Sequence, residues 1–496
     1  MIDLAAQLSV PFGMEVCKKP TVIKGYSPEK LFYFFEEITK IPRGSGNEEG
    51  IAKWLEAFAE ERGLFCIRDK VNNVFIRADA TAGYENEPAV LLQGHTDMVC
   101  EKNSDVVFDF EKDPIDIYVD GEGFLRARGT TLGADDGVAV AVMLALLDGE
   151  CEAHPALECL FTVEEETGLD GAKAFDYSVV RARKMINLDS ENDREVVVGC
   201  AGGLFHKVTL PIAKTALVGT CVRVSISGLM GGHSGANIDS GRANANKLLG
   251  RALLQIGEIC PLNLISICGG SKDNAIPREA SALIAVPDTE AFSVALDRIS
   301  KEIKNELSSD DSGFVMKWER VTAVKEMADR ESTDRIIGFI SSVQNGVLAM
   351  STNIDGLVEF SRNLGIISSE EDCVNFIFSA RSAIDSQLDF AASEIESLAR
   401  LFGGKAEQEG RYPGWEYAKI SPLRDKFIKV FREVNGCEPD INVIHAGLEC
   451  GIISSHIPDM DMISIGPGMR DIHSPEEALD LASFEKTWRI VCELLK

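Results

Sequence analysis

The chain has 496 residues, of which 45% are hydrophobic and 26% charged, a composition typical of a folded globular protein with more than one domain rather than a disordered or fibrous one. Its 79 acidic residues outnumber its 50 lysines and arginines, so the formal net charge is −29. Since nucleic acids and anionic membranes bind basic surfaces, we expect neither as a partner. The 13 scattered cysteines, the start of the chain, which has no signal-peptide pattern, and the lack of a long apolar run predict a cytoplasmic protein.

The first 200 residues alternate helical and strand-like segments. Ser27 is expected to cap a helix whose apolar residues recur at helical spacing from Leu31 to Ile38. Further helices are predicted at about 48–62 and 138–147, and strands at 71–77, 89–93, 157–163 and 185–188. This alternation predicts an α/β fold, with a sheet that carries helices on both faces.

The pattern changes from about residue 205. Four strand-like segments and two long helices predict an inserted α+β domain: strands at 206–212, 221–227, 263–268 and 280–286, and helices at 244–259 and 289–307. After residue 385 the alternation resumes, with a helix at 421–434, an apolar run at 462–465 and a last helix at 484–495. The α/β domain is therefore expected in two parts.

His95 and Asp97 end an apolar strand-like segment. They are two residues apart, so in an extended chain they share a face. A carboxylate beside a histidine fixes the tautomer of its ring, as metal-binding histidines usually require. Taken alone, the motif fits equally a structural histidine at a strand end.

Acidic residues and another histidine follow other predicted elements. Asp135 and Asp136 precede the apolar helix, three glutamates at 164–166 and Asp189 each follow a buried strand, and His473 follows a glycine-rich turn. Helix capping or a solvated loop would explain each of them alone. Together they lie where α/β sheets bind ligands, and imidazoles with carboxylates suit zinc, manganese or cobalt.

Eight segments in order resemble one family, the aminoacyl-histidine dipeptidases (Xaa-His dipeptidases), within the wider group of dizinc aminopeptidases, carboxypeptidases and aminoacylases. They are Gly94-His-Thr-Asp-Met-Val, Gly129-Thr-Thr-Leu-Gly-Ala-Asp-Asp-Gly, Glu165-Glu-Thr-Gly-Leu-Asp-Gly-Ala, Asn187-Leu-Asp-Ser-Glu, Gly199-Cys-Ala-Gly-Gly, Gly228-Leu-Met-Gly-Gly-His-Ser-Gly, Val443-Ile-His-Ala-Gly-Leu-Glu-Cys-Gly and Ser464-Ile-Gly-Pro-Gly. The resemblance implies a catalytic domain at 25–205 and 385–496, an inserted lid and dimerisation domain at 206–384, and a homodimer. Residues 1–24 are expected to be an extension.

The resemblance also implies two Zn²⁺ per subunit, with Co²⁺ or Mn²⁺ as substitutes. The implied ligands are His95, Asp135 and Asp189 for one ion, and Asp135, Glu166 and His473 for the other. Glu165 matches the general base, and Asp97 matches the residue that supports His95. Only the family motif selects Asp135 over Asp136 and Glu166 over Glu165, since the residues themselves leave both choices open. Asp136 stands where we expect asparagine in close relatives, and it adds charge beside the bridging carboxylate.

Substrate-binding residues are implied in and near the inserted domain. His233 matches a histidine that stabilises the transition-state oxygen. Arg381 is a candidate for the substrate carboxylate, which a guanidinium grips with two hydrogen bonds, and Asn274 is a weaker one. His445 and Glu449 lie in a matching motif and are expected to line the site, without an assigned role.

The predicted function is that of a cytoplasmic dizinc dipeptidase that hydrolyses short peptides, and Xaa-His dipeptides are its predicted substrates. A broader aminopeptidase or an N-acyl amino acid deacylase is the alternative within the hydrolases, because the same metal core serves both. A catalytically silent peptide-binding protein is an alternative from another class. The complete set of predicted ligands and the predicted base argue against it.

Overall fold

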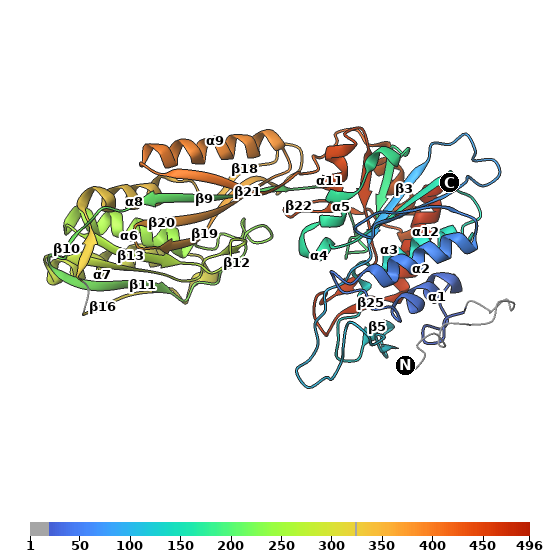
Figure 1. Ribbon diagram of the computed structural model, residues 1–496, viewed down its shortest axis with the longest axis horizontal. Coiled ribbons are helices and arrows are strands. Elements are labelled where there is room, and N and C mark those ends of the chain that lie inside the picture. Colours follow the sequence, from blue (N-terminus) through green and yellow to red (C-terminus); the bar gives the residue numbers. More distant parts are fainter. Residues whose placement is uncertain (1–18, 323–324) are drawn as a thin grey trace, which may run out of the picture. The chain divides into compact units, whose positions relative to one another are not determined.

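A computed structural model describes residues 19–322 and 325–496, and Figure 1 shows its elements. The chain forms two compact units. The first contains the residues up to Val196 together with Ser421–Asp440 and Met460–Lys496, and the second contains Val197–Ile420 and Ile441–Asp459. The chain passes between the units four times: within β8 (Glu195–Cys200), at Ile420/Ser421, within β22 (Asp440–Ile444) and at Asp459/Met460.

The central sheet of the first unit has its parallel strands in the middle. Its strands follow in the order β1 (Phe65–Arg68), β2 (Val74–Ala78), β6 (Leu157–Thr162), β3 (Val90–His95), β7 (Lys184–Asn187) and β23 (Asp461–Ser464). The pairs β6–β3, β3–β7 and β7–β23 are parallel, while β1 and β2 pair antiparallel at one edge. β3 and β6 are buried along their whole length, as parallel strands covered on both faces are.

Helices surround this sheet in the first unit. They are α1 (Glu29–Ile38), α2 (Glu49–Glu61), α3 (Ala134–Leu147), α10 (Pro422–Asn435) and α12 (Leu481–Leu495), with the short α4 (Glu165–Gly168) and α5 (Asp170–Ala174). The apolar α3 packs on β3 and α1. A Cβ on Gly94 of β3 would lie 2.2 Å from the Cβ of Ala139, so this close approach of strand and helix requires glycine.

Two smaller features complete the first unit. A second sheet has the order β24 (Met469–Arg470), β25 (Ala478–Asp480), β5 (Phe124–Ala127) and β4 (Ile117–Val119). The predicted N-terminal extension ends on α1, because the backbone N–H groups of Thr21, Val22 and Ile23 donate to the Glu36 carboxylate over 2.6–2.7 Å. Residues 1–18 of that extension lie outside the described residues.

The second unit is built on a long antiparallel sheet. Its strands follow in the order β16 (Val315–Arg320), β11 (Thr220–Ser227), β15 (Ala280–Val286), β13 (Asn263–Gly269), β19 (Val358–Ser369), β20 (Cys373–Ser382), β9 (Gly202–Pro211) and β21 (Lys405–Tyr412). β18 (Gly346–Met350) pairs with β19, β10 (Lys214–Ala216) with β17 (Glu326–Ala328), and β12 (Gly232–His233) with β14 (Ala275–Ile276). The helices of the unit are α6 (Ala245–Ile259), α7 (Thr289–Glu306), α8 (Arg330–Ser342), α9 (Asp385–Leu401) and α11 (Glu449–His456).

The second unit extends beyond the inserted domain expected at 206–384. It includes α9 and β21, because α9 packs on β9, β20 and β21, and β21 pairs with β9. Figure 1 shows α9 lying along these strands. It also begins earlier, at Val197 within β8, and includes Ile441–Asp459.

The second unit repeats one order of elements. When the strands of five residues or fewer (β10, β12, β14, β17 and β18) are set aside, a strand, a helix, two strands, a helix and a strand occur as β11-α6-β13-β15-α7-β16 and again as β9-α8-β19-β20-α9-β21. The first set is inserted between β9 and α8 of the second. The two sets meet at the centre of the sheet, where Cys268 of β13 pairs antiparallel with Ser368 of β19.

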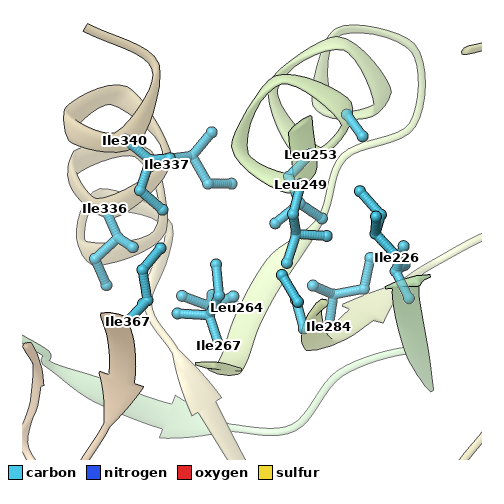
Figure 2. Close-up of a cluster of buried hydrophobic side chains, with 14 of the residues drawn as sticks. Ile226, Leu249, Leu253, Leu264, Ile267, Ile284, Ile336, Ile337, Ile340 and Ile367 are labelled. Atoms are coloured by element: carbon cyan, nitrogen blue, oxygen red, sulfur yellow. The ribbon is translucent and has the colours of Figure 1, made fainter. Parts of the chain in front are cut away.

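Apolar side chains of both sets form one core in this unit. Figure 2 shows α6 and α8 directing leucine and isoleucine side chains toward the strands. The labelled side chains are Ile226, Leu249, Leu253, Leu264, Ile267, Ile284, Ile336, Ile337, Ile340 and Ile367, all of them buried. Within the described residues, no helix is long and apolar enough to cross a membrane.

His206 makes the stability of the second unit depend on pH. The side chain is fully buried on β9, and neither ring nitrogen has a hydrogen-bond partner among the described residues. Burial, and then the nearby Arg362 guanidinium, lowers the pKa of His206 to about 4. An unfolded histidine has a pKa of about 6.5, so between these values the unfolded chain binds the extra proton, and stability falls as the pH falls.

The substitution His206→Gln removes this titration. Between pH 7 and pH 5, the free energy of unfolding of the unsubstituted chain is expected to fall by about 2 kcal/mol more than that of the variant. Denaturant unfolding at the two pH values measures this difference, with His456→Gln, an exposed histidine of the same unit, as the control. Equal pH dependence of the unfolding free energy in all three proteins would contradict the lowered pKa of His206.

Candidate metal centre

The ends of parallel strands bring the predicted residues of the first unit together. His95 is the last residue of β3, and Asp189 follows the end of β7 by two residues. Glu165 and Glu166 begin α4, shortly after β6. Since β3 lies between β6 and β7 with all three strands parallel, these side chains meet at one edge of the sheet.

The Asp135 carboxylate lies between two histidines. Its Oδ1 is 2.9 Å from Nε2 of His95, and its Oδ2 is 3.1 Å from Nε2 of His473. Nε2 of His95 is also 3.5 Å from Oδ1 of Asp189, and Nε2 of His473 is 2.9 Å from Oε1 of Glu166. Each oxygen of Asp135 therefore belongs to a different group of side chains.

Three overlapping sets of side chains have the geometry of a metal site. In each set, one nitrogen or oxygen atom per residue lies within 4.8 Å of the others. The sets are His95 with Asp135 and Asp189, Asp135 with Glu166 and His473, and also His95 with Glu165 and Glu166. Imidazole nitrogens and carboxylate oxygens are donors that zinc, cobalt and manganese accept, so the residues present fit divalent cations.

The electrostatics of the site indicate an excess of buried negative charge. Burial, reinforced by neighbouring carboxylates, raises the pKa of Asp189 to about 6 and that of Glu191 to about 7. Burial, and then Asp189, also raises the pKa of Asp136 well above its usual value. Hydrogen bonds from Asp135 and Glu166 raise the pKa of His473 to about 10. Because a bound cation stabilises ionised carboxylates, cations would relieve this repulsion.

Asp97 contacts both the His95 ring and the backbone of the two glutamates. Its Oδ1 lies 3.4 Å from Nδ1 of His95, on the ring edge opposite Asp135. The same carboxylate accepts hydrogen bonds from the backbone N–H of Glu165 at 3.1 Å and of Glu166 at 3.3 Å, and from Oγ of Ser45 at 2.8 Å. Asp97 thus fixes the start of α4 as well as the His95 ring.

The geometry distinguishes the adjacent acids that the sequence left open. Asp136 is fully buried, and its oxygens accept the backbone N–H groups of His95 and Ala139, at 3.2 and 3.3 Å. Its neighbour Asp135 instead points to both histidines. Glu166 contacts His473 and also groups with His95, whereas among the described residues Glu165 occurs only in the group with His95.

Three other predicted residues gather in the second unit. Burial, and then the nearby Arg381 guanidinium, lowers the pKa of His233. Burial, followed by the charges of Arg381 and His233, lowers the pKa of His445 to about 4. Nε2 of His445 is 2.7 Å from Oγ of Ser361. Arg381 donates to the hydroxyl of Tyr412 at 2.9 Å, and its buried Nε has no partner among the described residues.

The tautomer of His233 follows from its hydrogen bonds. Its Nδ1 accepts the backbone N–H groups of Gly235 and Ala236, at 3.3 and 3.1 Å. The neutral ring therefore carries its proton on Nε2, where it can be donated. Asn274 is exposed, and its backbone carbonyl accepts the backbone N–H of Ser234. Glu449 is fully buried at the start of α11, and its expected place in the lining of the site stays a prediction.

The sequence analysis did not find several residues that form hydrogen bonds with the predicted site residues or with the backbone beside them. Tyr412 and Ser361 lie on strands without a distinctive motif, and Ser45, Arg43 and Glu477 come from loops far from Asp135 in sequence. No local pattern identifies such partners, because the contacts form only when the strands and loops assemble.

Comparison with known proteins shows which family the chain belongs to. Residues 91–496 match the family model described as Peptidase family M20/M25/M40. The chain belongs to this family. It is therefore a metal-dependent peptidase, and the resemblance found in the sequence and the predicted α/β fold are confirmed.

Full-length relatives support the same assignment to M20. The "Cytosol non-specific dipeptidase" of Escherichia coli K12 is 40% identical over 474 residues, which cover 95% of this chain and 98% of the relative. The crystal structure of aminoacylhistidine dipeptidase from Vibrio alginolyticus is 37% identical, with a TM-score of 0.91 over 96% of this chain and 98% of that one. The structure of aminopeptidase PepT from Bacillus cereus, at 18% identity and a TM-score of 0.54, shares the fold.

Proposed function

We propose that this M20 peptidase is a cytoplasmic dizinc dipeptidase that hydrolyses short peptides, Xaa-His dipeptides among them. The observation that carries the proposal is the Asp135 carboxylate, with one oxygen beside His95 and the other beside His473. The names of the Escherichia coli and Vibrio relatives support a dipeptide as the substrate. One relative is called non-specific and the other aminoacylhistidine-directed, so both kinds of dipeptide belong in the test.

The side chains of the first unit would hold the cations. His95, Asp135 and Asp189 would bind one ion, and Asp135, Glu166 and His473 the other. Bound zinc would supply Lewis-acid polarisation of the peptide carbonyl and an acidified water nucleophile at neutral pH. Asp97 would keep the His95 ring oriented through Nδ1.

Glu165 is the proposed general base. It begins α4, where its backbone N–H is held by Asp97, and its carboxylate groups with His95 and Glu166. In this position it would accept a proton from the nucleophile and return it to the amine that leaves.

The His233–Arg381–His445 group of the second unit is proposed to bind the oxyanion of the reacting peptide and its terminal carboxylate. The Nε2 proton of His233 suits an oxyanion, while the buried Arg381 guanidinium, with its spare Nε, suits a carboxylate. The exposed Asn274 beside Ser234 would assist in this binding. The homodimer implied by the resemblance remains a prediction, which sedimentation analysis of the purified chain tests.

The substitution Arg381→Lys tests recognition of the carboxylate. It keeps the charge but removes the planar pair of donors, so KM for a free dipeptide is expected to rise about tenfold or more. KM for the C-terminal amide of the same dipeptide should change little. Initial rates on both substrates measure the effect, with Arg223→Lys on the exposed face of β11 as the control. Equal changes in KM for acid and amide would contradict this role.

A substrate panel tests the proposed function itself. Metal-loaded and metal-depleted enzyme is assayed on Ala-His, Ala-Ala, β-Ala-His and N-acetyl-Ala-His. We expect hydrolysis of the free-amine dipeptides, Ala-His among them, and loss of activity on metal depletion. Faster release from the N-acetylated substrate would instead assign a deacylase, and activity that survives metal depletion would refute the metal centre.

A further inference from the structure

A buried carboxylate anchors the loop that leads into Asp135. Glu477 is 2% exposed. Its Oε2 accepts the backbone N–H groups of Leu132 at 2.7 Å and Gly133 at 3.0 Å, and its Oε1 accepts that of Ala134 at 2.8 Å. Successive N–H groups before Asp135 thus converge on one side chain, which comes from a distant part of the sequence.

A buried guanidinium also binds the same loop. Arg43 is also 2% exposed, and it donates to the carbonyl oxygens of Thr96 at 2.9 Å, of Asp97 at 3.2 Å and of Gly133. Its hydrogen bonds therefore reach backbone on both the β3 end and the loop before Asp135. Gly133 is held by both side chains, because its backbone N–H donates to Glu477 and its carbonyl accepts a hydrogen bond from Arg43.

Gly133 shows how tightly this loop is held. It has a φ of +70°, which favours glycine. A Cβ at this position would lie 2.5 Å from a terminal nitrogen of Arg43 and 2.7 Å from Sδ of Met98. The backbone two residues before Asp135 therefore lies against the Arg43 and Met98 side chains, with no room for a larger residue.

The two side chains connect the loops that carry the predicted ligands. Glu477 follows His473 by four residues, so one short segment both supplies a histidine and binds the backbone next to Asp135. Arg43 joins that backbone to the carbonyls of Thr96 and Asp97, directly after His95. His95, Asp135 and His473 are thus linked through backbone contacts as well as through the carboxylate of Asp135.

We propose that Arg43 and Glu477 are positioning residues that aim the Asp135 carboxylate at both metal positions and thereby set metal affinity. This inference rests on the proposed metal centre. A carboxylate shared by two ions must present each oxygen in a fixed direction, and freeing the loop before Asp135 allows the carboxylate to rotate away. Residues that orient metal ligands in this way change metal affinity by about 10- to 100-fold.

The substitution Glu477→Gln tests the proposal on the full chain. Its amide nitrogen cannot accept a hydrogen bond, so part of the N–H set before Asp135 loses its acceptor while the volume is kept. Zn²⁺ dissociation constants are measured by chelator competition, and kcat and KM at saturating metal. We expect Zn²⁺ to bind about tenfold or more weakly, with KM unchanged. Glu476→Gln, the same change at the exposed neighbour, should bind Zn²⁺ like the unsubstituted chain.

Arg43→Lys provides a second variant at the hydrogen bond to the Gly133 carbonyl, and carries the test if Glu477→Gln does not fold. It retains the charge but loses the fork of donors, so weaker Zn²⁺ binding is expected again. Folded variants that bind Zn²⁺ as tightly as the Glu476→Gln control would overturn the positioning role. If the unsubstituted chain itself binds no Zn²⁺, the proposed metal centre fails instead.

Discussion

The substitution Asp135→Asn is expected to abolish dipeptide hydrolysis and to weaken metal binding at both positions by more than about 100-fold, because even residues that only orient a ligand cost 10–100-fold. Asparagine keeps the volume of the side chain but offers one acceptor oxygen and no charge. The carboxylate oxygens beside His95 and His473 could then no longer both bind a cation. Metal content by mass spectrometry and initial rates on Ala-His measure the two effects.

The adjacent acid provides a matched control. Asp136→Asn makes the same chemical change, at a side chain that accepts backbone N–H groups from His95 and Ala139. It should keep both ions and most of the activity. Asp189→Asn should weaken the His95 position more than the His473 position, since Asp189 contacts only His95 of the two histidines among the described contacts. If Asp136→Asn lost both ions and Asp135→Asn kept them, Asp136 and not Asp135 would be the carboxylate that the two ions share.

The substitution Glu165→Ala should lower kcat by about 10²–10⁴-fold while metal content and fold remain nearly intact. Glu165 is assigned the transfer of protons. His473 instead contacts Glu166 and Asp135, which are predicted metal ligands. Steady-state kinetics with metal analysis of the same preparation separate these roles. Glu165→Gln should behave like the alanine variant, because an amide cannot accept the proton.

Glu164→Gln is the control for this prediction, since it changes the adjacent acid of the same turn. It should leave kcat within a few-fold of the unsubstituted enzyme. Retained turnover in Glu165→Ala, or loss of metal without loss of fold, would contradict the role of Glu165 as the base.

Much of the α/β core could be predicted from local patterns. The apolar segment predicted at 138–147 is the buried part of α3, and the strands predicted at 89–93, 157–163 and 185–188 are β3, β6 and β7. Their order in the sheet explains why acids and histidines that are distant in sequence meet. The predicted cap at Ser27 was wrong, because α1 begins at Glu29 and Pro28 takes the cap position.

The extent of the second unit could not be predicted in the same way. The buried residues of α9, such as Leu388 and Ile395, repeat at ordinary helical spacing, and this pattern does not show which sheet the helix covers. The repeated order of elements also leaves no visible repeat in the sequence. Strand order and helix packing can be preserved while the side chains diverge.

The candidate site was only partly accessible from the sequence. The motif spacing identified the residues that gather around Asp135, but Asp135 and Asp136 are indistinguishable by composition, and only their hydrogen bonds separate them. Arg43 and Glu477 lie in segments without any pattern of their own. Their importance arises from contacts with backbone groups, which depend on the folded position of two other loops.

Anomalous diffraction from zinc-loaded crystals tests the central claim most directly. Maps calculated from data above and below the zinc absorption edge should show two peaks about 3.5–4 Å apart, one on each side of the Asp135 carboxylate. One peak should contact His95 and the other His473. A single peak, or peaks that leave Asp135 uncoordinated, would contradict the account.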